Sequence, residues 1–315
     1  MTAKLKNLIS AADLSAEHVK ILFDLTDKYK NYLAESKTRG IPIEVEPLRD
    51  RTLALIFEKP SLRTRVTFMV GMAQLGGLAI DIRAEQVLQG RETIADVSRN
   101  LDRWVDALVA RTFKHRTVLE LAKYARIPVI NALSDLEHPC QVLADFYTIR
   151  QIKGENWKEI KLVYIGDGNN VCHSLLLLTA NLGGQMTVAT PPKYDPKDSI
   201  LRIAKKKAQA TGATLKFTHD VKEAVKGADF VYTDVWTSMG FEAEREQRRT
   251  AFGPFQVNEA LMSLAKPDAK FLHCLPAKRG EEVVDGVIDG PHSAVFDQAE
   301  NRLHVQKALL VHLLT

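Results

Sequence analysis

Short apolar segments alternate with helical patterns along nearly the whole chain, and this alternation most constrains the fold. Apolar residues fill consecutive positions of each short segment, as in strands that are buried on both faces. We expect strands at residues 52–57, 78–82, 107–110 and 128–132, and again at 162–165, 186–189, 215–217, 230–233, 271–274 and 294–296. The alternation therefore predicts an α/β fold with parallel sheets.

A polar break at residues 153–156, after an expected helix at 139–151, divides the pattern into two series. We expect two doubly wound parallel-sheet domains with helices on both faces, one at 1–152 and one at 153–299. The closing helix, 300–315, is expected to pack back on the first domain. In such sheets ligands bind beyond the carboxyl ends of the strands, which places an active site in the interdomain cleft.

The bulk properties exclude several classes of protein. The 315 residues are 45% hydrophobic and 26% charged, with a formal net charge of +4. This mild charge favours a small anionic substrate and argues against nucleic acid as a partner. No apolar stretch is long enough to cross a membrane. The three cysteines form no Cys-x-x-Cys pair, so we expect neither a disulfide framework nor a metal site, and a cytoplasmic location.

The junction after residues 52–57 has the features of an anion site. The sequence FEKPSLRTR leads into helical spacing, and we expect the helix to start at Ser61. A helix start directs free N–H groups at one point, and Ser61, Arg63 and Thr64 add hydroxyls and a guanidinium that suit a phosphate. The alternative is a Ser N-cap beside a solvated pair of arginines.

Two further groups follow the next strands of the first half. Arg111 ends one strand, and His138 and Gln141 lie three residues apart at a helix start, where both can face one side. Together they could polarise a carbonyl oxygen and bind an amide. Individually, a surface arginine and a capping or core histidine are the alternatives.

The second half has polar residues at comparable strand ends. The sequence GDGNN lacks the third glycine of a dinucleotide fingerprint, so Asn170 either stabilises a turn or donates to a carboxylate. Asp234 and Ser238 end another strand and could bind an ammonium group, and Cys274 ends a third. Arg302 begins the last helix. The alternatives are a solvated loop at Asp234, a buried structural thiol at Cys274 and a helix-surface arginine at Arg302.

Six motifs taken together resemble the carbamoyltransferase family, in the family's order and over nearly the whole chain. They are SLRTR, ARTF, HPCQ, GDGNN, DVWTSMG and HCLPAKRG. The resemblance is strongest to the members that use ornithine. It implies transfer of the carbamoyl group of carbamoyl phosphate to ornithine, giving citrulline and phosphate for arginine biosynthesis. It also implies a homotrimer or an assembly of trimers, and no metal or organic cofactor.

The resemblance assigns roles to individual residues. Arg111, His138, Cys274, Asp234 and Thr64 would be catalytic. The carbamoyl phosphate ligands would be Ser61, Leu62, Arg63, Thr64, Arg111, His138, Gln141, Cys274, Leu275 and Arg302. The ornithine ligands would be Asn170, Asp234, Ser238 and Met239.

One stretch, residues 85–92, departs from the family's pattern, in which this loop reaches toward a neighbouring subunit. Gln86 and Gln89 are the candidates for that contact. The other acceptors to consider are putrescine, acylated ornithine and aspartate, and a non-catalytic ligand-binding relative is a further alternative. The tripeptide Ser238-Met239-Gly240 and Cys274 favour free ornithine, and Asp234 argues against aspartate, which would call for basic residues in its place.

Overall fold

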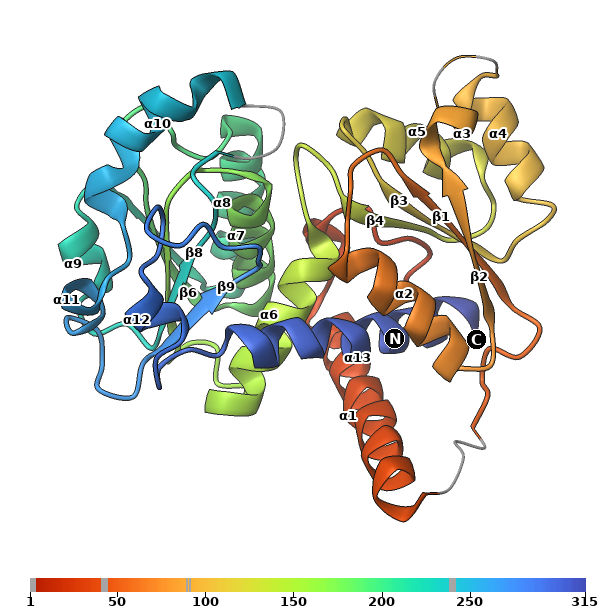
Figure 1. The fold of residues 1–315 in the computed structure, drawn as a ribbon, viewed down its shortest axis with the longest axis horizontal. Coiled ribbons are helices and arrows are strands. Elements are labelled where there is room, and N and C mark those ends of the chain that lie inside the picture. The colour runs from red at the N-terminus through yellow and green to blue at the C-terminus, as the bar shows by residue number, and fades with distance from the viewer. Residues whose placement is uncertain (1–3, 41–44, 89, 91, 238–241) are drawn as a thin grey trace. The chain divides into compact units, whose positions relative to one another are not determined.

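The computed structural model describes all residues except 1–3, 41–44, 89, 91 and 238–241. The chain forms two compact units, one of Met1–Tyr147 with Glu300–Thr315 and one of Thr148–Ala299. The chain passes between them inside two helices, α6 (Pro139–Lys153) and α13 (Val295–Leu314). Figure 1 labels the elements.

The first unit contains a four-stranded parallel sheet in the order β2-β1-β3-β4. The strands are β1 (Thr52–Phe57), β2 (Leu78–Arg83), β3 (Ala107–Arg111) and β4 (Val129–Leu133). From β1 the chain crosses to β2 at one edge of the sheet, and it then returns past β1 to β3 and on to β4 at the other edge. Because such crossovers are right-handed, α2 (Arg63–Gln74) covers one face, and α4 (Ile94–Leu101) and α5 (His115–Tyr124) cover the other.

Packing in this unit follows that division. Ala54 and Ile56 of β1 pack with Val97 of α4 and Val118 of α5 in one apolar cluster. The remaining elements are the 3-10 helix η1 (Ala11–Asp13), α1 (Ala16–Arg39) and α3 (Ala84–Val87). The last helix contacts α2, where a Cβ on Gly71 would lie 3.2 Å from the Lys307 side chain. A glycine here therefore lets α13 approach closely.

The second unit contains a five-stranded parallel sheet in the order β7-β6-β5-β8-β9. Its strands are β5 (Lys161–Ile165), β6 (Gln185–Ala189), β7 (Thr214–Thr218), β8 (Phe230–Thr233) and β9 (Lys270–His273). Its helices are α7 (Asn170–Leu182), α8 (Asp198–Thr211), α9 (Val221–Val225), η2 (Glu242–Glu244), α10 (Arg245–Phe252), η3 (Gly253–Phe255), α11 (Glu259–Met262) and α12 (Asp285–Ile288). The strand order reverses beside β5, so β5 and β8 end at the switch point where open α/β sheets bind ligands.

The parallel sheets with helices between the strands confirm the expected fold class. One strand was wrongly predicted, at residues 294–296. Ala294 donates one backbone hydrogen bond to Phe271, and Val295 already begins α13. The apolar run there leads into the first turn of the helix, where Val295 is buried and Phe296 is exposed, and a short apolar run does not distinguish such a turn from a strand. None of the helices formed by the described residues combines the length and apolar character that a membrane crossing requires.

Candidate active site

The N-terminus of α2 lies just beyond the end of β1. The helix begins at Arg63, two residues later than predicted, and its N-cap is Leu62. No described side chain caps this helix start, so Ser61 is not the N-cap that the alternative required. Leu62 cannot cap because it has no side-chain acceptor, and a helix start directs its N–H groups and the positive end of its dipole outward, which favours an anion.

Arg111 lies at the same edge of the sheet. It ends β3, pairs in register with Phe57 of β1, and its carbonyl accepts from the Glu58 N–H at 2.8 Å. Its side chain is buried. The parallel pairing of β1 and β3 is therefore what brings Arg111 beside the segment that leads into α2.

His138 is buried where three arginines converge. Burial lowers its pKa well below the ordinary value, and the charges of Arg302, Arg111 and Arg63 lower it further. The imidazole is therefore neutral at physiological pH. A neutral ring can donate one hydrogen bond and accept another, so it suits an uncharged carbonyl while the arginines suit an anion.

Arg302 joins two of the other sequence candidates. Its Nη1 donates to Gln141 Oε1 at 2.7 Å, and its Nη2 donates to Thr64 Oγ1 at 2.7 Å. All three side chains are buried. Arg302 is thus not the helix-surface arginine of the alternative, and residues from α2, α6 and α13 meet at one point in the first unit.

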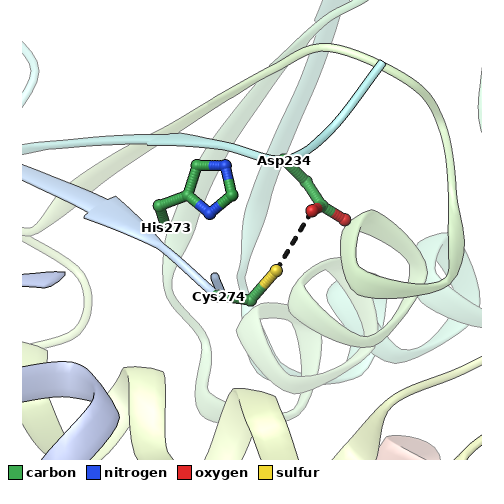
Figure 2. A group of neighbouring side chains, drawn as sticks. All are labelled: Asp234, His273 and Cys274. Carbon is green, nitrogen blue, oxygen red and sulfur yellow. Dashed lines mark hydrogen bonds between the residues drawn. The ribbon is translucent and has the colours of Figure 1, made fainter. Parts of the chain in front are cut away.

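Asp234 is the centre of a second group, in the other unit. Cys274 Sγ donates to Asp234 Oδ1 at 3.1 Å (Figure 2), and Asn169 Nδ2 donates to Asp234 Oδ2 at 2.7 Å. Asp234 follows β8 and Cys274 follows β9, and these strands are neighbours in the sheet. A carboxylate, a thiol and an amide therefore meet at the carboxyl ends of these strands.

Asp234, His273 and Cys274 each offer a ligand atom within 4.8 Å of one another, the spacing of a metal site. However, both ring nitrogens of His273 are engaged. Leu275 N–H donates to Nδ1 at 2.8 Å, and Nε2 lies 3.2 Å from Glu282 Oε1. Since a metal would have to displace one of these contacts, the group does not fit a metal centre as it stands.

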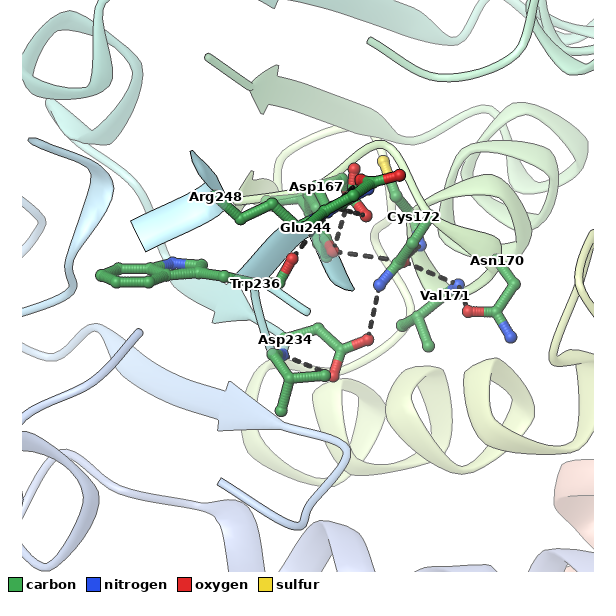
Figure 3. Close-up of polar contacts among 11 residues, drawn as sticks. Asp167, Asn170, Val171, Cys172, Asp234, Trp236, Glu244 and Arg248 are labelled. Atoms are coloured by element: carbon green, nitrogen blue, oxygen red, sulfur yellow. Dashed lines mark hydrogen bonds and ion pairs between the residues drawn. The ribbon is translucent and has the colours of Figure 1, made fainter. Parts of the chain in front are cut away.

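Two asparagines start α7. Asn169 is the N-cap, and its Oδ1 accepts from the N–H groups of Val171 and Cys172. Asn170 Oδ1 lies 3.1 Å from the Val171 N–H (Figure 3). Both asparagines thus support the turn, and the Asn170 amide N–H₂ is the part that can serve a ligand.

Arg248 of α10 links the loops that follow β5 and β8. Its Nη1 donates to Asp167 Oδ2 and to the Trp236 carbonyl, both at 2.9 Å, and its Nε donates to Glu244 (Figure 3). Burial raises the pKa of Asp167 to about 6, although the charge of Arg248 opposes this. The buried Arg248 therefore fixes Asp167, two residues before Asn169, and Trp236, two residues after Asp234.

Two family descriptions match the chain. Residues 6–151 match "Aspartate/ornithine carbamoyltransferase, carbamoyl-P binding domain", and residues 158–313 match "Aspartate/ornithine carbamoyltransferase, Asp/Orn binding domain". The chain belongs to the aspartate/ornithine carbamoyltransferase family. Most residues of the first site therefore lie in the part that matches the carbamoyl-P binding domain, whereas its Arg302 and the second site lie in the part that matches the Asp/Orn binding domain.

Relatives within the carbamoyltransferases match over nearly their full length. An ornithine carbamoyltransferase of Anoxybacillus flavithermus is 53% identical over 310 residues, covering 98% of this chain and 96% of that protein. The anabolic ornithine carbamoyltransferase of Pyrococcus furiosus is 50% identical over 306 residues, covering 97% and 95%. The solved structure of ornithine carbamoyltransferase from Pyrococcus furiosus has a TM-score of 0.93, 49% identity and 99% coverage of both chains.

Some residues that the carbamoyltransferase resemblance named cannot be placed. Ser238, Met239 and Gln89 lie outside the described residues, as does the side chain of Gln86. Conversely, sequence reasoning missed four buried charged residues near the sites: Lys59, Asp145, Arg248 and Glu282. Only Asp145 had a usable signal, since it is one helical turn after Gln141. Burial together with Arg111 lowers the pKa of Lys59, which places that amine beside the first site.

Proposed function

We propose that this protein transfers the carbamoyl group of carbamoyl phosphate to the side-chain amine of L-ornithine, giving L-citrulline and phosphate. The observation that carries the proposal is the buried contact of Arg302 with Gln141 and Thr64, close to a buried His138 on which the charges of Arg302, Arg111 and Arg63 act. Three fixed positive charges beside an uncharged donor match a ligand with an anionic phosphate at one end and a carbonyl at the other.

The phosphate would bind at the start of α2. The backbone N–H of Leu62, the hydroxyls of Ser61 and Thr64 and the guanidinium groups of Arg63 and Arg111 supply the donors. The uncapped helix start supports this role because its N–H groups and dipole favour an anion.

The carbamoyl end would lie against His138, Gln141 and Arg302. His138, Arg111 and Thr64 polarise the carbonyl oxygen, and Gln141 and the Leu275 carbonyl accept from the carbamoyl amide. Arg302 donates to both Gln141 and Thr64, so it joins the proposed carbamoyl end of the site to the start of α2, where the phosphate would bind. This contact supports the placement.

Ornithine would bind in the second domain. Asn170 and the Met239 N–H receive the α-carboxylate, and Asp234 and Ser238 the α-amine, while Asp234 and Cys274 orient the side-chain amine. We assign carbamoyl phosphate to a first domain, 1–152 with the closing helix, and ornithine to a second domain, 153–299. The family descriptions of the two halves support this assignment.

The mechanism starts with deprotonation of ornithine. Its amine resembles that of lysine, with a pKa of about 10.4, so only roughly one molecule in a few thousand is neutral at pH 7. The neutral nitrogen attacks the carbamoyl carbon, and the oxyanion is stabilised by donors from Thr64, Arg111 and His138. The bond to the phosphate oxygen then breaks, phosphate leaves, and the nitrogen loses its second proton, for which Asp234 is the nearby acceptor.

Self-association would use an apolar face of the first unit. Arg65 of α2 pairs with Asp81 of β2 at 3.2 Å, so the two elements lie side by side. Their outward side chains include exposed Val66, Met69, Val70, Leu78 and Ile80. Because so large an apolar group on an edge strand and its neighbouring helix marks an interface, we propose a homotrimer, alone or in larger assemblies, with Gln86 or Gln89 reaching the neighbour.

The cellular setting would be arginine biosynthesis in the cytoplasm. The name of the Pyrococcus furiosus relative, an anabolic enzyme, supports the direction toward citrulline. The three cysteines are present as thiols, which suits a reducing compartment.

An acceptor panel tests the activity. Purified protein is given carbamoyl phosphate with ornithine, putrescine, N-acetylornithine or aspartate, and the carbamoylated product is measured. Rapid citrulline formation with ornithine alone supports the proposal. A preference for another acceptor, or no product at all, contradicts it.

A further inference from the structure

The amide of Gln141 lies between a group that can only donate and a group that can only accept. Arg302 Nη1 donates to Gln141 Oε1 at 2.7 Å. On the other side, Gln141 Nε2 donates to Asp145 Oδ1 at 2.8 Å, one turn further along α6. All three side chains lie in the first unit.

Because the three side chains are buried, only one orientation of the Gln141 amide satisfies both contacts. Asp145 is 0% exposed, Gln141 is 1% exposed and Arg302 is 3% exposed. Rotating the amide by half a turn would direct its NH₂ group at the guanidinium and its oxygen at the carboxylate. Because a guanidinium has no acceptor and a carboxylate no donor, both contacts would become repulsive, with little water to replace them.

We propose that Asp145 is a positioning and specificity-determining residue, which keeps Gln141 as a hydrogen-bond acceptor toward the ligand. A carbonyl oxygen has two lone pairs, and Arg302 uses one. The second can accept from the NH₂ of a carbamoyl group. This inference rests on the proposed contact between Gln141 and carbamoyl phosphate.

An acceptor at this position selects among acyl phosphates of nearly the same shape. The NH₂ of a carbamoyl group donates to the second lone pair of Gln141 Oε1, whereas the methyl group of acetyl phosphate leaves that lone pair without a donor. A buried polar group that loses its partner costs about tenfold to a hundredfold in affinity. Asp145, which touches no substrate in this arrangement, would act only through Gln141.

The test compares three ligands by calorimetry: carbamoyl phosphate, acetyl phosphate and inorganic phosphate. Asp145→Ala removes the acceptor for Gln141 Nε2. We expect the affinity for carbamoyl phosphate to fall about tenfold or more, with little change for the other two ligands. Asp145→Asn is the matched variant, because its amide oxygen can still accept, and it should keep most of the preference for carbamoyl phosphate.

Several outcomes would overturn the inference. One is an equal loss of affinity for all three ligands in Asp145→Ala, which is the signature of a general structural defect. Another is an affinity for carbamoyl phosphate that is unchanged in Asp145→Ala. A third is a loss of affinity for carbamoyl phosphate in Asp145→Asn that equals the loss in Asp145→Ala. If Asp145→Ala does not fold, Asp145→Leu also removes the acceptor without leaving a cavity, and the same results are required of it.

Gln141→Ala separates this inference from the proposed function. If Gln141→Ala binds carbamoyl phosphate as the wild type does, the proposed contact itself is wrong and the inference falls with it. If Gln141→Ala weakens carbamoyl phosphate binding and Asp145→Ala does not, only the role of Asp145 is wrong.

Discussion

Cys274 donates its thiol hydrogen to one oxygen of Asp234, with Sγ and Oδ1 3.1 Å apart. The other oxygen accepts from Asn169 at 2.7 Å, so the carboxylate is fixed from both sides. A thiol is a weak donor, and an ammonium group of the substrate would make a stronger contact with the same oxygen. We propose that the pair releases Asp234 to an incoming amine.

Asp234→Asn should lower kcat/KM for ornithine by about a hundredfold or more, since it keeps the shape of the side chain and removes the proton acceptor. Carbamoyl phosphate binding should be unchanged. Cys274→Ser, which keeps a hydrogen-bond donor, should lose less. Steady-state citrulline formation measures both, and wild-type turnover in Asp234→Asn would rule out this role.

The rate should rise with pH from neutrality into the alkaline range, because the attacking amine must lose its proton. His138 should not contribute to this rise, since burial and three arginines keep its pKa well below the ordinary value. His138→Asn should thus be slower but keep the same dependence on pH. A wild-type profile that is flat from pH 6 to 9 would contradict amine deprotonation.

Asp167 should make stability depend on pH. Burial raises its pKa from 3.8 to about 6, so between these values the folded state binds a proton that the unfolded state does not. The cost of the buried charge is small at pH 4, grows as the pH rises toward 6, and levels off above that value. The free energy of unfolding of Asp167→Asn, relative to wild type, should therefore increase by roughly 1–3 kcal/mol from pH 4 to 6.5. Denaturant unfolding at several pH values measures this difference, and no trend would contradict it.

Ile80→Glu should dissociate the assembly, because it places a charge in the apolar face of α2 and β2. Light scattering measures the mass. Phe217→Glu is the matched control, since Phe217 is also exposed on an edge strand but lies in the other unit. A monomeric wild type, or an Ile80→Glu protein of wild-type mass, would refute the interface.

The sequence predicted most strands of the two parallel sheets, and it singled out residues at their carboxyl ends as site candidates. Strands such as β3 and β8 are apolar on consecutive residues because both faces are covered, and this pattern is visible without coordinates. Residues at the ends of neighbouring strands lie together because parallel strands end at one edge of a sheet, as Arg111 lies beside Glu58 in the first unit and Asp234 beside Cys274 in the second.

The charged residues that support the sites could not be predicted in the same way. Asp145 and Arg248 lie on helices, where charged residues are usually solvated, and nothing in the local sequence shows that tertiary packing buries them. The strand wrongly expected at 294–296 has a related cause, since a run of three apolar residues does not show that Val295 begins a helix.

Calorimetry with carbamoyl phosphate tests the central claim most directly, that the start of α2 and its arginines bind this ligand. The wild type should bind carbamoyl phosphate, and Arg63→Ala should weaken binding by roughly tenfold to a hundredfold, since it removes a charge-assisted contact to the phosphate. No binding by the wild type, or equal binding by Arg63→Ala, would contradict the account.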